Sequence, residues 1–454
     1  MVAEELRRIE HLHTSPRGSS PLQSRTVDRI RILIVLHQFL PSSIGGVELY
    51  TYTLAKELKK RFLTVQVLCP TYDRSAPAGS ISADIVDDIN VTRITLHPEG
   101  DLVDTFANNQ AAFAFARFLD ESEVDIVHFQ HLMGLSGTSI HVCSRKQVPI
   151  LMTVHDAWLI CQQSHLLQPD GSFCRRGPET TAKCLYCLLR RYPHQAQDRR
   201  LPDLFEALSL RERFLRNALN SVDTLIFCSH FIQDIFRANG LEHKRMVFSP
   251  LGLAPFSPRP YQTKRDILCI SFFGAVFFTK GLDLLIDAFN LLPPASSELH
   301  IYGPIVNQDY FREVMSRIKA DRTVNYHGQY GSEQLPVILA TTDITVIPSR
   351  MESFSLVTRE SLHAKVPVIG PDIGGIPEVI QDNINGFLFR SGDYRDLANK
   401  LMILIRHPEK LNTLRNGIGP IRTIAEEVDE LESIYQDALC RRGAPVGRRQ
   451  IIAS

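Results

Sequence analysis

The stretch that decides the fold runs from Arg31 to Cys69 and reads RILIVLHQFLPSSIGGVELYTYTLAKELKKRFLTVQVLC. It opens with a short β-branched run, RILIVL, and a loop that ends in two glycines. The apolar residues of the next segment, VELYTYTLAKELKK, recur at helical spacing, and VQVLC reads as a second strand. Two strands joined by a helix in this way predict a βαβ unit and therefore a parallel sheet covered by helices.

The same alternation continues along the chain and then starts again. The runs DIVHF, PILMTV, TLIFC and MVFSP alternate with helical patterns up to about Pro250, where a proline-rich segment without periodicity predicts a boundary. The pattern restarts with ILCISFF, GLDLLIDAFNLL, ELHIYG, VNYHG, DITVIP and VPVIG. We therefore predict an α/β protein with two parallel-sheet domains, 30–250 and 251–440, between a disordered tail at 1–29 and a loose tail at 441–454. Since ligands bind at the carboxyl ends of parallel strands, the two units are expected to enclose one deep cleft.

Composition limits the classes of protein to consider. The 454 residues are 44% hydrophobic and 22% charged, which is ordinary for a soluble globular chain. Fifty basic residues balance fifty acidic ones, so no nucleic-acid partner is predicted from bulk charge. The first thirty residues lack the apolar core of a signal peptide, and no long uninterrupted apolar stretch follows. We expect a cytoplasmic protein.

The most informative site pattern lies between Arg350 and Gly375, RMESFSLVTRESLHAKVPVIGPDIGG. Glu352 and Glu360 stand eight residues apart across a predicted loop-to-helix junction. The unpaired N–H groups and the positive dipole end of that helix suit a phosphate, and the two carboxylates suit hydroxyl groups. The segment Ser353, Phe354, Ser355 and Leu356 would supply the amides.

Three further candidates follow predicted strands. Gly45 and Gly46 open a helix and let the backbone approach a phosphate or sugar, although a plain tight turn explains them too. His155 and Asp156 follow PILMTV and should reach the cleft, where a histidine can bind a sugar hydroxyl or be satisfied by backbone. Lys280 precedes Gly281 and a helix, and suits a diphosphate unless it is a solvated loop lysine.

The order of these motifs resembles the retaining glycosyltransferases of family 4. The resemblance spans Arg31 to Gln436. It implies the GT-B fold, in which two Rossmann-like domains face each other across a cleft, with the acceptor bound by the first and the donor by the second. It also implies transfer of a sugar from a nucleotide diphosphate, UDP- or GDP-linked, to a hydroxyl of a saccharide or lipid-linked acceptor. The usual family roles are in polysaccharide or glycoconjugate assembly, without a metal ion in catalysis.

The resemblance also assigns roles to residues. Those implied near the reacting groups are His155, Asp156, Lys280 and Glu352, and those implied to bind the donor are Gly45, Gly46, Gly274, Lys280, Ser353, Phe354, Ser355, Leu356 and Glu360. Glu360 would bind the ribose, Glu352 the donor sugar, and Glu48 would face the acceptor.

One position departs from the family pattern. Where relatives have Gly-Arg-Leu before the spacer and Lys-Gly, this chain has Gly274, Ala275 and Val276. Alanine cannot make the bidentate contact of an arginine with a diphosphate. Arg350 and Arg359, which flank the glutamate motif, are the substitutes we consider.

Other functions remain open at this stage. The two glutamates can be read as the acid and base of a glycosidase, whose separation sequence does not give, or as exposed residues on a helix face. One alternative is a nucleotide-sugar epimerase, which has a similar two-domain fold. Another is a protein that binds a sugar nucleotide without catalysis, because Ala275 stands where relatives have arginine.

A cysteine-rich insertion, 158–200, follows His155. It holds Cys161, Cys174, Cys184 and Cys187, with His165 or His194 as alternatives to one thiolate. Four thiols in so short a segment predict a structural zinc that would staple the insertion, ahead of reduced unligated cysteines and of an iron–sulfur cluster. Such an insertion is placed to form a wall of the acceptor site.

Basic residues gather in two places. They are Lys56, Lys59, Lys60 and Arg61 in the first, and Arg190, Arg191, Arg199, Arg200, Arg211, Arg213 and Arg216 in the second. Solvated helix faces explain most such runs. Family members that use lipid-linked acceptors touch the membrane through their N-terminal half. A second hypothesis is therefore that this chain makes peripheral contact with the inner face of a membrane.

Overall fold

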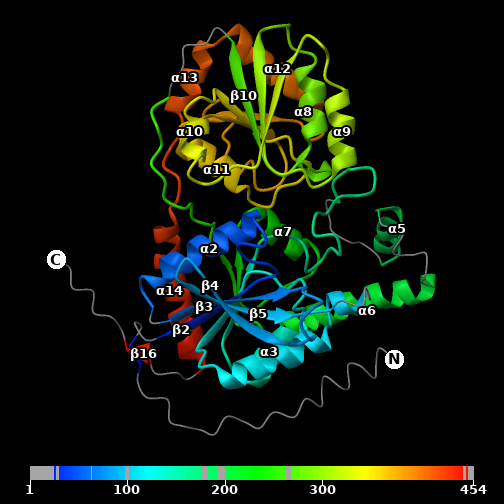
Figure 1. Cartoon of the computed structure of the whole chain (residues 1–454), viewed down its shortest axis with the longest axis vertical. Coiled ribbons are helices and arrows are strands. Elements are labelled where there is room, and N and C mark those ends of the chain that lie inside the picture. Colours follow the sequence, from blue (N-terminus) through cyan, green and yellow to red (C-terminus); the bar gives the residue numbers. More distant parts are fainter. Residues whose placement is uncertain are drawn as a thin grey trace, which may run out of the picture.

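The protein is described by a computed structural model. It covers residues 25–26, 30–62, 64–97, 102–174, 181–191, 200–261, 267–442 and 446–447. Two domains stand one above the other, the N-terminal one below in Figure 1, and each is built on a parallel sheet. The predicted α/β class is therefore confirmed. Most of the two predicted tails lies outside the described residues, but a short parallel pair joins β1 (Arg25–Thr26) to β16 (Val446–Gly447).

The N-terminal sheet has eight strands in the order β4-β5-β3-β2-β6-β7-β8-β9. Only β4 and β5 at one edge are antiparallel, and every other neighbouring pair is parallel. The residues Ile32 to Val35 of the central strand β2 are all buried, as a strand between two helical layers requires. The strands are β2 (Arg31–Val35), β3 (Thr64–Thr71), β4 (Ile81–Val86), β5 (Ile89–Thr95), β6 (Ile126–Phe129), β7 (Ile150–Val154), β8 (Thr224–Phe227) and β9 (Met246–Phe248).

Helices cover both faces of this sheet, so two apolar cores form. One core includes Phe115 of α3 and Phe214 of α6, and the other includes Leu54 and Leu58 of α2. The helices are α2 (Gly46–Lys59), η2 (Val103–Thr105), α3 (Asn109–Glu121), α4 (Thr138–Arg145), α5 (Thr181–Arg191), α6 (Leu201–Leu219) and α7 (His230–Ala238).

The C-terminal sheet has six strands, all parallel, in the order β12-β11-β10-β13-β14-β15. Its strands are β10 (Leu268–Phe273), β11 (Ser297–Tyr302), β12 (Thr323–Gly328), β13 (Ile344–Val346), β14 (Val368–Pro371) and β15 (Gly386–Phe389). Its helices are η4 (Phe278–Lys280), α8 (Leu282–Phe289), α9 (Gln308–Ser316), α10 (Leu335–Leu339), α11 (Leu356–His363), α12 (Tyr394–Arg406) and α13 (Glu409–Asn416).

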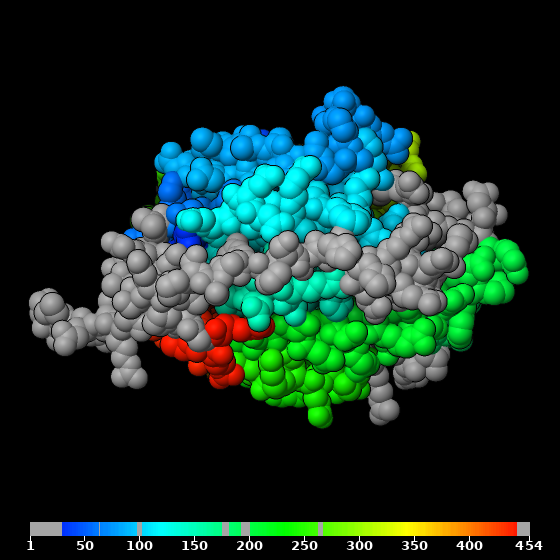
Figure 2. All heavy atoms as spheres, turned by 90° about the horizontal axis from the view of Figure 1, so that it is seen from below, coloured from blue at the N-terminus to red at the C-terminus, as the bar shows by residue number. Residues whose placement is uncertain are grey.

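The last helix, α14 (Ile424–Arg441), crosses back to the N-terminal domain. Its apolar face shares a core with α2, and Tyr435 is fully buried there. Figure 2, seen from below, shows red residues of the C-terminal end of the chain at the surface of that domain. The predicted boundary, which kept 251–440 in one unit, therefore differs from the structure. The 3.6-residue period of this helix reveals an apolar stripe but not which domain will cover it.

Buried polar contacts fix α14 in place. The Tyr50 hydroxyl donates to Glu427 at 2.5 Å, and the backbone N–H of Gly252 donates to the other Glu427 oxygen at 2.6 Å. Burial raises the pKa of Glu427 to about 7. About two turns further along the helix, the Tyr435 hydroxyl lies 2.8 Å from Nδ1 of the buried His128. The buried polar groups of Tyr50, Glu427, Tyr435 and His128 thus have partners, which offset the cost of their desolvation.

Two further contacts tie the domains together. Glu378 of the C-terminal domain accepts from the first backbone amides of α7, His230 at 3.1 Å and Phe231 at 2.7 Å. Phe354 of the C-terminal domain is 5% exposed and belongs to the core formed by α2 and α14. Among the described helices, none is long and apolar enough to cross a membrane.

We predict that Tyr435→Ala destabilises the protein by about 3–5 kcal/mol, because it opens a cavity in a filled core and removes the partner of His128. Tyr435→Phe should cost only about 1 kcal/mol, since it removes one hydrogen bond. Urea unfolding measures both, with the exposed Ser433→Ala as the matched control on the same helix. Equal stability of Tyr435→Ala and wild type would contradict the burial of α14.

Candidate active site

Polar side chains line a pocket where strands β6 and β7 of the N-terminal sheet end. The pocket is lined by residues from both strand ends, among them Gln130, His131, His155, Asp156 and Trp158. The carboxyl ends of parallel strands meet at one edge of the sheet, which explains why residues 25 positions apart come together here. The sequence argument from strand ends thus leads to this pocket.

His155 is buried and held by its neighbours. Its Nε2 lies 2.7 Å from the Gln130 side-chain oxygen, and its ring meets the Tyr50 ring edge-on at 5.3 Å. Burial, and then the nearby His131, lower the pKa of His155 to about 3. The imidazole is therefore neutral at physiological pH. A neutral ring held by one nitrogen can hydrogen-bond a ligand hydroxyl with the other.

Asp156 stays ionised in the same pocket. Burial alone would raise its pKa, but His131 at 3.3 Å and the backbone N–H of Trp158 at 2.8 Å outweigh it, so the pKa is lowered. The carboxylate is about one-third exposed, 31%, which leaves it accessible to a ligand. Its orientation is fixed from two sides.

The Gly45–Gly46 loop lies beside this pocket at the start of α2. A Cβ on Gly45 would stand 2.5 Å from the Glu48 carboxylate, so a larger residue there would displace the Glu48 side chain. Glu48 accepts from Ser43 at 3.0 Å and lies 3.6 Å from His37. Gly46 faces Leu356 of the C-terminal domain, whose methyl would stand 3.9 Å from an added Cβ. The glycine loop therefore sits at the domain interface.

Sequence reasoning missed three polar residues here: Gln130 and His131, which line the pocket, and His37, whose ring lies beside that of His131. Burial, and then His131, lower the pKa of His37 to about 3, and the two rings lie 4.5 Å apart. A signal was present, because His37 comes just after β2 and Gln130 and His131 come directly after β6. These are the same strand-end positions that pointed to His155.

Across the interface, Lys280 and Glu352 form an ion pair in the C-terminal domain. The Lys280 ammonium lies 2.6 Å from Glu352, which also accepts from Ser349 at 2.7 Å. Gly281 after the lysine has φ +70°, and a Cβ there would stand 2.1 Å from the Pro348 carbonyl oxygen. Glycine is thus required to bring the Lys280 turn against the strand that leads to Glu352.

The segment 353–356 opens helix α11. Ser355 is its N-cap, with a strained φ of +61°, and its hydroxyl accepts from the Thr358 amide at 3.4 Å. Gly374 and Gly375 support this turn, since a Cβ on either would meet the backbone oxygen of Glu352 or Ser353 within 2.4 Å. Non-glycine residues at positive φ concentrate at ligand sites. Phosphate binding by this turn stays a prediction.

Glu360 lies within α11 with no ion pair or side-chain hydrogen bond among the described residues. Burial raises its pKa to about 7. Its charge interacts with Tyr330, whose ring packs edge-on against Phe273 at 5.5 Å. Glu360 is half-buried, and a half-buried carboxyl without such a partner among the described residues can accept hydrogen bonds from a ligand.

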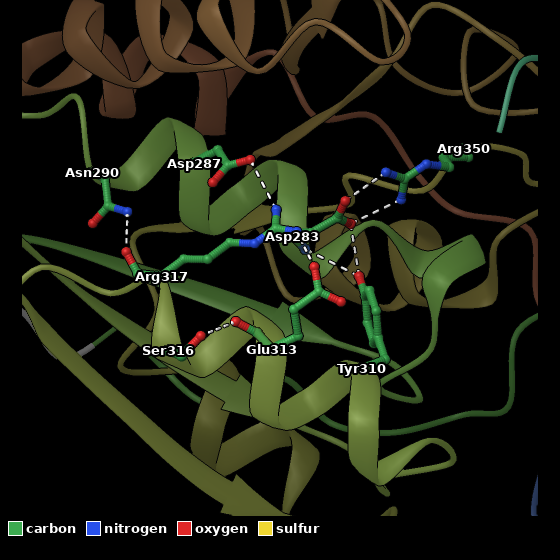
Figure 3. Close-up of polar contacts among 8 residues, drawn as sticks. All are labelled: Asp283, Asp287, Asn290, Tyr310, Glu313, Ser316, Arg317 and Arg350. Atoms are coloured by element: carbon green, nitrogen blue, oxygen red, sulfur yellow. Dashed lines mark hydrogen bonds and ion pairs between the residues drawn. The ribbon is translucent and has the colours of Figure 1, made fainter. Parts of the chain in front are cut away.

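Neither arginine proposed to replace the missing one at Ala275 is free to do so. Arg350 makes a bidentate pair with Asp283 at 2.9 and 2.6 Å and lies 3.9 Å above the Phe278 ring. Figure 3 shows this pair together with Tyr310, which donates to the same carboxylate at 2.7 Å. Arg359 is buried and donates to the carbonyls of Phe354 and Ser355. The hypothesis that Arg350 or Arg359 takes the place of the missing arginine is therefore not supported, because both side chains already have protein partners.

The four cysteines of the insertion gather in one region but do not converge. The charge of Cys184 interacts with those of Cys161, Cys174 and Cys187, and burial raises its pKa to about 12. Among the described residues, the sulfurs of no three of them lie close enough to share an ion. His194 lies outside the described residues. His165 instead interacts with Asp156, Lys280 and Glu352.

One other group of potential metal ligands exists among the described residues. Cys269, Glu298 and His300 have ligand atoms within 4.8 Å of one another on neighbouring strands β10 and β11. The His300 ring is already 3.2 Å from Glu298 and 2.9 Å from His327. This group was not predicted, and it stands apart from the residues named above.

The structure defines a two-domain protein built on parallel sheets, and comparison with known proteins gives its family. Residues 44–254 match the model of Glycosyltransferase Family 4, and residues 256–418 match that of Glycosyl transferases group 1. The chain belongs to the family 4 type of glycosyltransferases and has the GT-B fold.

Individual relatives are distant. The chain is 23% identical over 416 residues to the D-inositol 3-phosphate glycosyltransferase of Corynebacterium aurimucosum, covering 87% of this chain and 91% of that protein. It is 30% identical over 141 residues to an uncharacterized 41.2 kDa protein in the cps region of Klebsiella pneumoniae, covering 31% and 37%. The match thus spans little more than a third of the Klebsiella protein.

Solved structures share the fold. Sucrose-phosphate synthase from Thermosynechococcus elongatus superposes with a TM-score of 0.68 at 18% identity, covering 91% of this chain and all of that one. Anabaena HepE, solved with UDP and glucose, superposes with a TM-score of 0.59 at 18% identity, covering 91% and 99%.

The raised pKa of Glu360 predicts a pH dependence of UDP binding. Below pH 7 the carboxyl is largely protonated, and above pH 7 it is ionised and accepts hydroxyl hydrogen bonds more strongly. Raising the pH from 6 to 8 increases the ionised fraction about tenfold, so the affinity for UDP should rise by up to about that factor. Calorimetry at several pH values measures this rise, which should be absent in Glu360→Gln. A fall in affinity with pH in wild type alone would contradict the assignment.

Proposed function

We propose that this glycosyltransferase moves a sugar from a nucleotide diphosphate to an acceptor hydroxyl with retention of the anomeric configuration. The observation that carries the proposal is the pairing of two features of the C-terminal domain. Glu360 is a half-buried carboxyl that has no ion pair or side-chain hydrogen bond among the described residues, and the Lys280–Glu352 pair stands beside the turn that opens the same helix. A nucleoside diphosphate offers ribose hydroxyls for the first and a diphosphate for the second. Anabaena HepE was solved with UDP-glucose, which agrees with such a donor.

Each wall of the site has a part in this reaction. In the proposal, Lys280 exchanges its Glu352 partner for the diphosphate and stabilises the charge that develops on it, while Glu352 binds the donor sugar. The turn 353–356 supplies backbone amides, and the glycine loop at 45–46 lets the donor approach. Neutral His155 and ionised Asp156 bind hydroxyls of the reacting sugar and the acceptor.

Retention follows in this proposal from a front-side attack. The bond between the sugar and the diphosphate breaks first, the acceptor oxygen bonds to the same face, and its proton passes to the leaving phosphate oxygen. The protein then contributes position and charge stabilisation rather than a nucleophile. Proton NMR of the product tests this directly, because an inverted anomeric configuration would contradict it.

The acceptor is proposed to be a saccharide or a lipid-linked saccharide, in polysaccharide or glycoconjugate assembly. The partial likeness to a protein of the cps region supports this direction. An epimerase would interconvert the nucleotide sugar without an acceptor, and a binder would turn nothing over. Ala275, with Arg350 and Arg359 both engaged, is the observation that favours the binder. Analysis of products from a nucleotide sugar with mixed acceptors separates the three.

We predict that UDP, GDP or ADP, or their sugars, raise the melting temperature of the wild-type protein. Glu360→Ala should weaken the affinity for the stabilising ligand at least about tenfold, since hydrogen bonds to a charged group contribute about 1.5–3 kcal/mol. Glu409→Ala, an exposed glutamate in the same domain, is the control and should bind like wild type. Equal binding by Glu360→Ala would remove Glu360 from the donor site.

A structural zinc in the insertion remains part of the proposal. The thiols of Cys161, Cys174 and Cys187 interact electrostatically with that of Cys184, although no three of these sulfurs, all among the described residues, lie within ion-sharing distance. Thiolates are the ligands that structural zinc prefers. Zinc would draw the four sulfurs together and fix α5 against the rest of the insertion.

The prediction is about one zinc per chain in protein purified without chelator, measured by elemental analysis. Cys184→Ser combined with Cys187→Ser should lose that metal and lower the melting temperature, whereas Cys440→Ser, at an exposed cysteine outside the insertion, should not. Metal content well below one per chain in wild type would end the zinc proposal.

Membrane contact and the cytoplasmic location stay predictions. Several of the basic side chains have partners, since Lys60 pairs with Glu57, Arg61 pairs with Glu432, and Arg211 is buried against Trp158. Arg199 lies outside the described residues. Co-sedimentation with vesicles, with and without anionic lipid, tests the contact.

A further inference from the structure

The cysteine-rich insertion contains a small hairpin that stands between the two domains. Leu167 and Phe173 pair in antiparallel fashion, and the Cys174 amide donates to the Leu166 carbonyl at 2.7 Å. The hairpin turns at Gly171, whose φ of +84° suits glycine. Short-range hydrogen bonds thus give this segment a defined shape.

The base of the hairpin is anchored on the N-terminal domain. Leu166 is buried in a cluster with Ala157 and Ile235 of α7, and the Phe173 ring lies 5.6 Å from that of Phe231. The Ala157 amide donates to the Ser164 carbonyl at 3.3 Å, which ties the segment just after His155 to the segment before the hairpin. The hairpin is therefore held next to the His155–Asp156 pocket.

The tip of the hairpin reaches the C-terminal domain. A Cβ added to Gly171 would stand 2.9 Å from the Phe278 ring and 3.4 Å from Nε of Arg350. Phe278 begins the short helix that ends at Lys280, and Arg350 is held by Asp283. The insertion thus bridges from the acceptor side of the site to the turn that carries the proposed diphosphate-binding lysine.

His165 occupies the base of this bridge under backbone strain. The residues on both sides of it have positive φ, Ser164 at +64° and Leu166 at +51°, and a branched side chain such as leucine rarely adopts that conformation. Such strained backbone conformations persist only where the surrounding packing holds them in place, and they cluster at functional sites. One on each side of His165 therefore indicates a functional role for this residue.

The charged groups around His165 come from both domains. It interacts electrostatically with Asp156 of the N-terminal domain and with Lys280 and Glu352 of the C-terminal domain, as well as with Arg191 of α5. Three of these partners, Asp156, Lys280 and Glu352, are among the residues named above as site candidates. The charged groups that act on His165 thus come mainly from the candidate site, and no cysteine of the insertion is among them.

We infer that His165 is a substrate-contacting residue supplied by the insertion, and that its imidazole hydrogen-bonds a sugar hydroxyl at the point of transfer. The inference rests on the proposed function, because it assumes a sugar between Asp156 and the Lys280–Glu352 pair. Through this contact the insertion would take part in binding the substrate. The hairpin closes a third side of the site, between walls that belong to separate domains.

This role differs from that of the nucleotide-binding residues. Glu360 and the turn 353–356 are proposed to hold the nucleotide, whereas His165 would touch only the sugar portion. Loss of its side chain should therefore slow turnover and leave the affinity for free UDP unchanged. A purely structural role would instead lower stability and weaken both properties together.

The test compares His165→Ala, His165→Asn and the exposed hairpin control Gln168→Ala with wild type. UDP affinity is measured by calorimetry, UDP release from UDP-glucose by a coupled assay with and without added saccharides, and folding by melting temperature. The expected result is UDP affinity within about twofold for all variants. UDP release should fall at least about tenfold in His165→Ala, recover in part in His165→Asn, which keeps a hydrogen-bonding group, and stay unchanged in Gln168→Ala.

Two results would overturn the inference. One is turnover by His165→Ala within twofold of wild type, and the other is a parallel loss of UDP affinity and melting temperature in both His165 variants. Failure of wild type to bind UDP, GDP, ADP and their sugars would be a distinct outcome. It would refute the proposed function, and this inference with it.

Discussion

The return of helix α14 to the N-terminal domain is the constraint on which the rest of the structure depends. The chain ends its second sheet with α13 and then buries the apolar face of α14 against α2. The Glu427 carboxyl accepts from Tyr50 and from the amide of Gly252, so the crossing is fixed at a buried polar point. Because the chain passes between the domains at Gly252 and again before α14, two connections hold the sheets opposite each other.

That arrangement explains why the site is assembled from strand ends. His155 and Asp156 follow β7, Gln130 and His131 follow β6, and Glu352 follows β13 by a few residues. Glycines then allow backbone segments to approach closely, as at Gly281 against Pro348. Charges that would be costly alone are compensated locally, which the Arg350–Asp283 pair illustrates. Glu360 is the carboxyl in this region that lacks such a partner among the described residues.

Much of the fold was readable from local pattern. β2, α2 and β3 follow from the period change within Arg31–Cys69, and the glycine, histidine and lysine motifs follow strands where a parallel sheet places them. The features that local pattern does not predict depend on contacts between residues distant in sequence. Periodicity cannot say which domain covers α14, and the sequence does not reveal that Arg350 is already held by Asp283. His165 was read as a spare thiolate substitute, because nothing local indicates that its hairpin spans the two domains.

Phe354 links these parts in a further way. It belongs to the turn at the start of α11, yet its side chain is buried with residues of α2 and α14 in the other domain. Swinging the two domains apart would draw this ring out of its apolar setting and expose it to water, which disfavours the open arrangement. The packing of the two domains therefore helps to hold the turn at the start of α11 in its place.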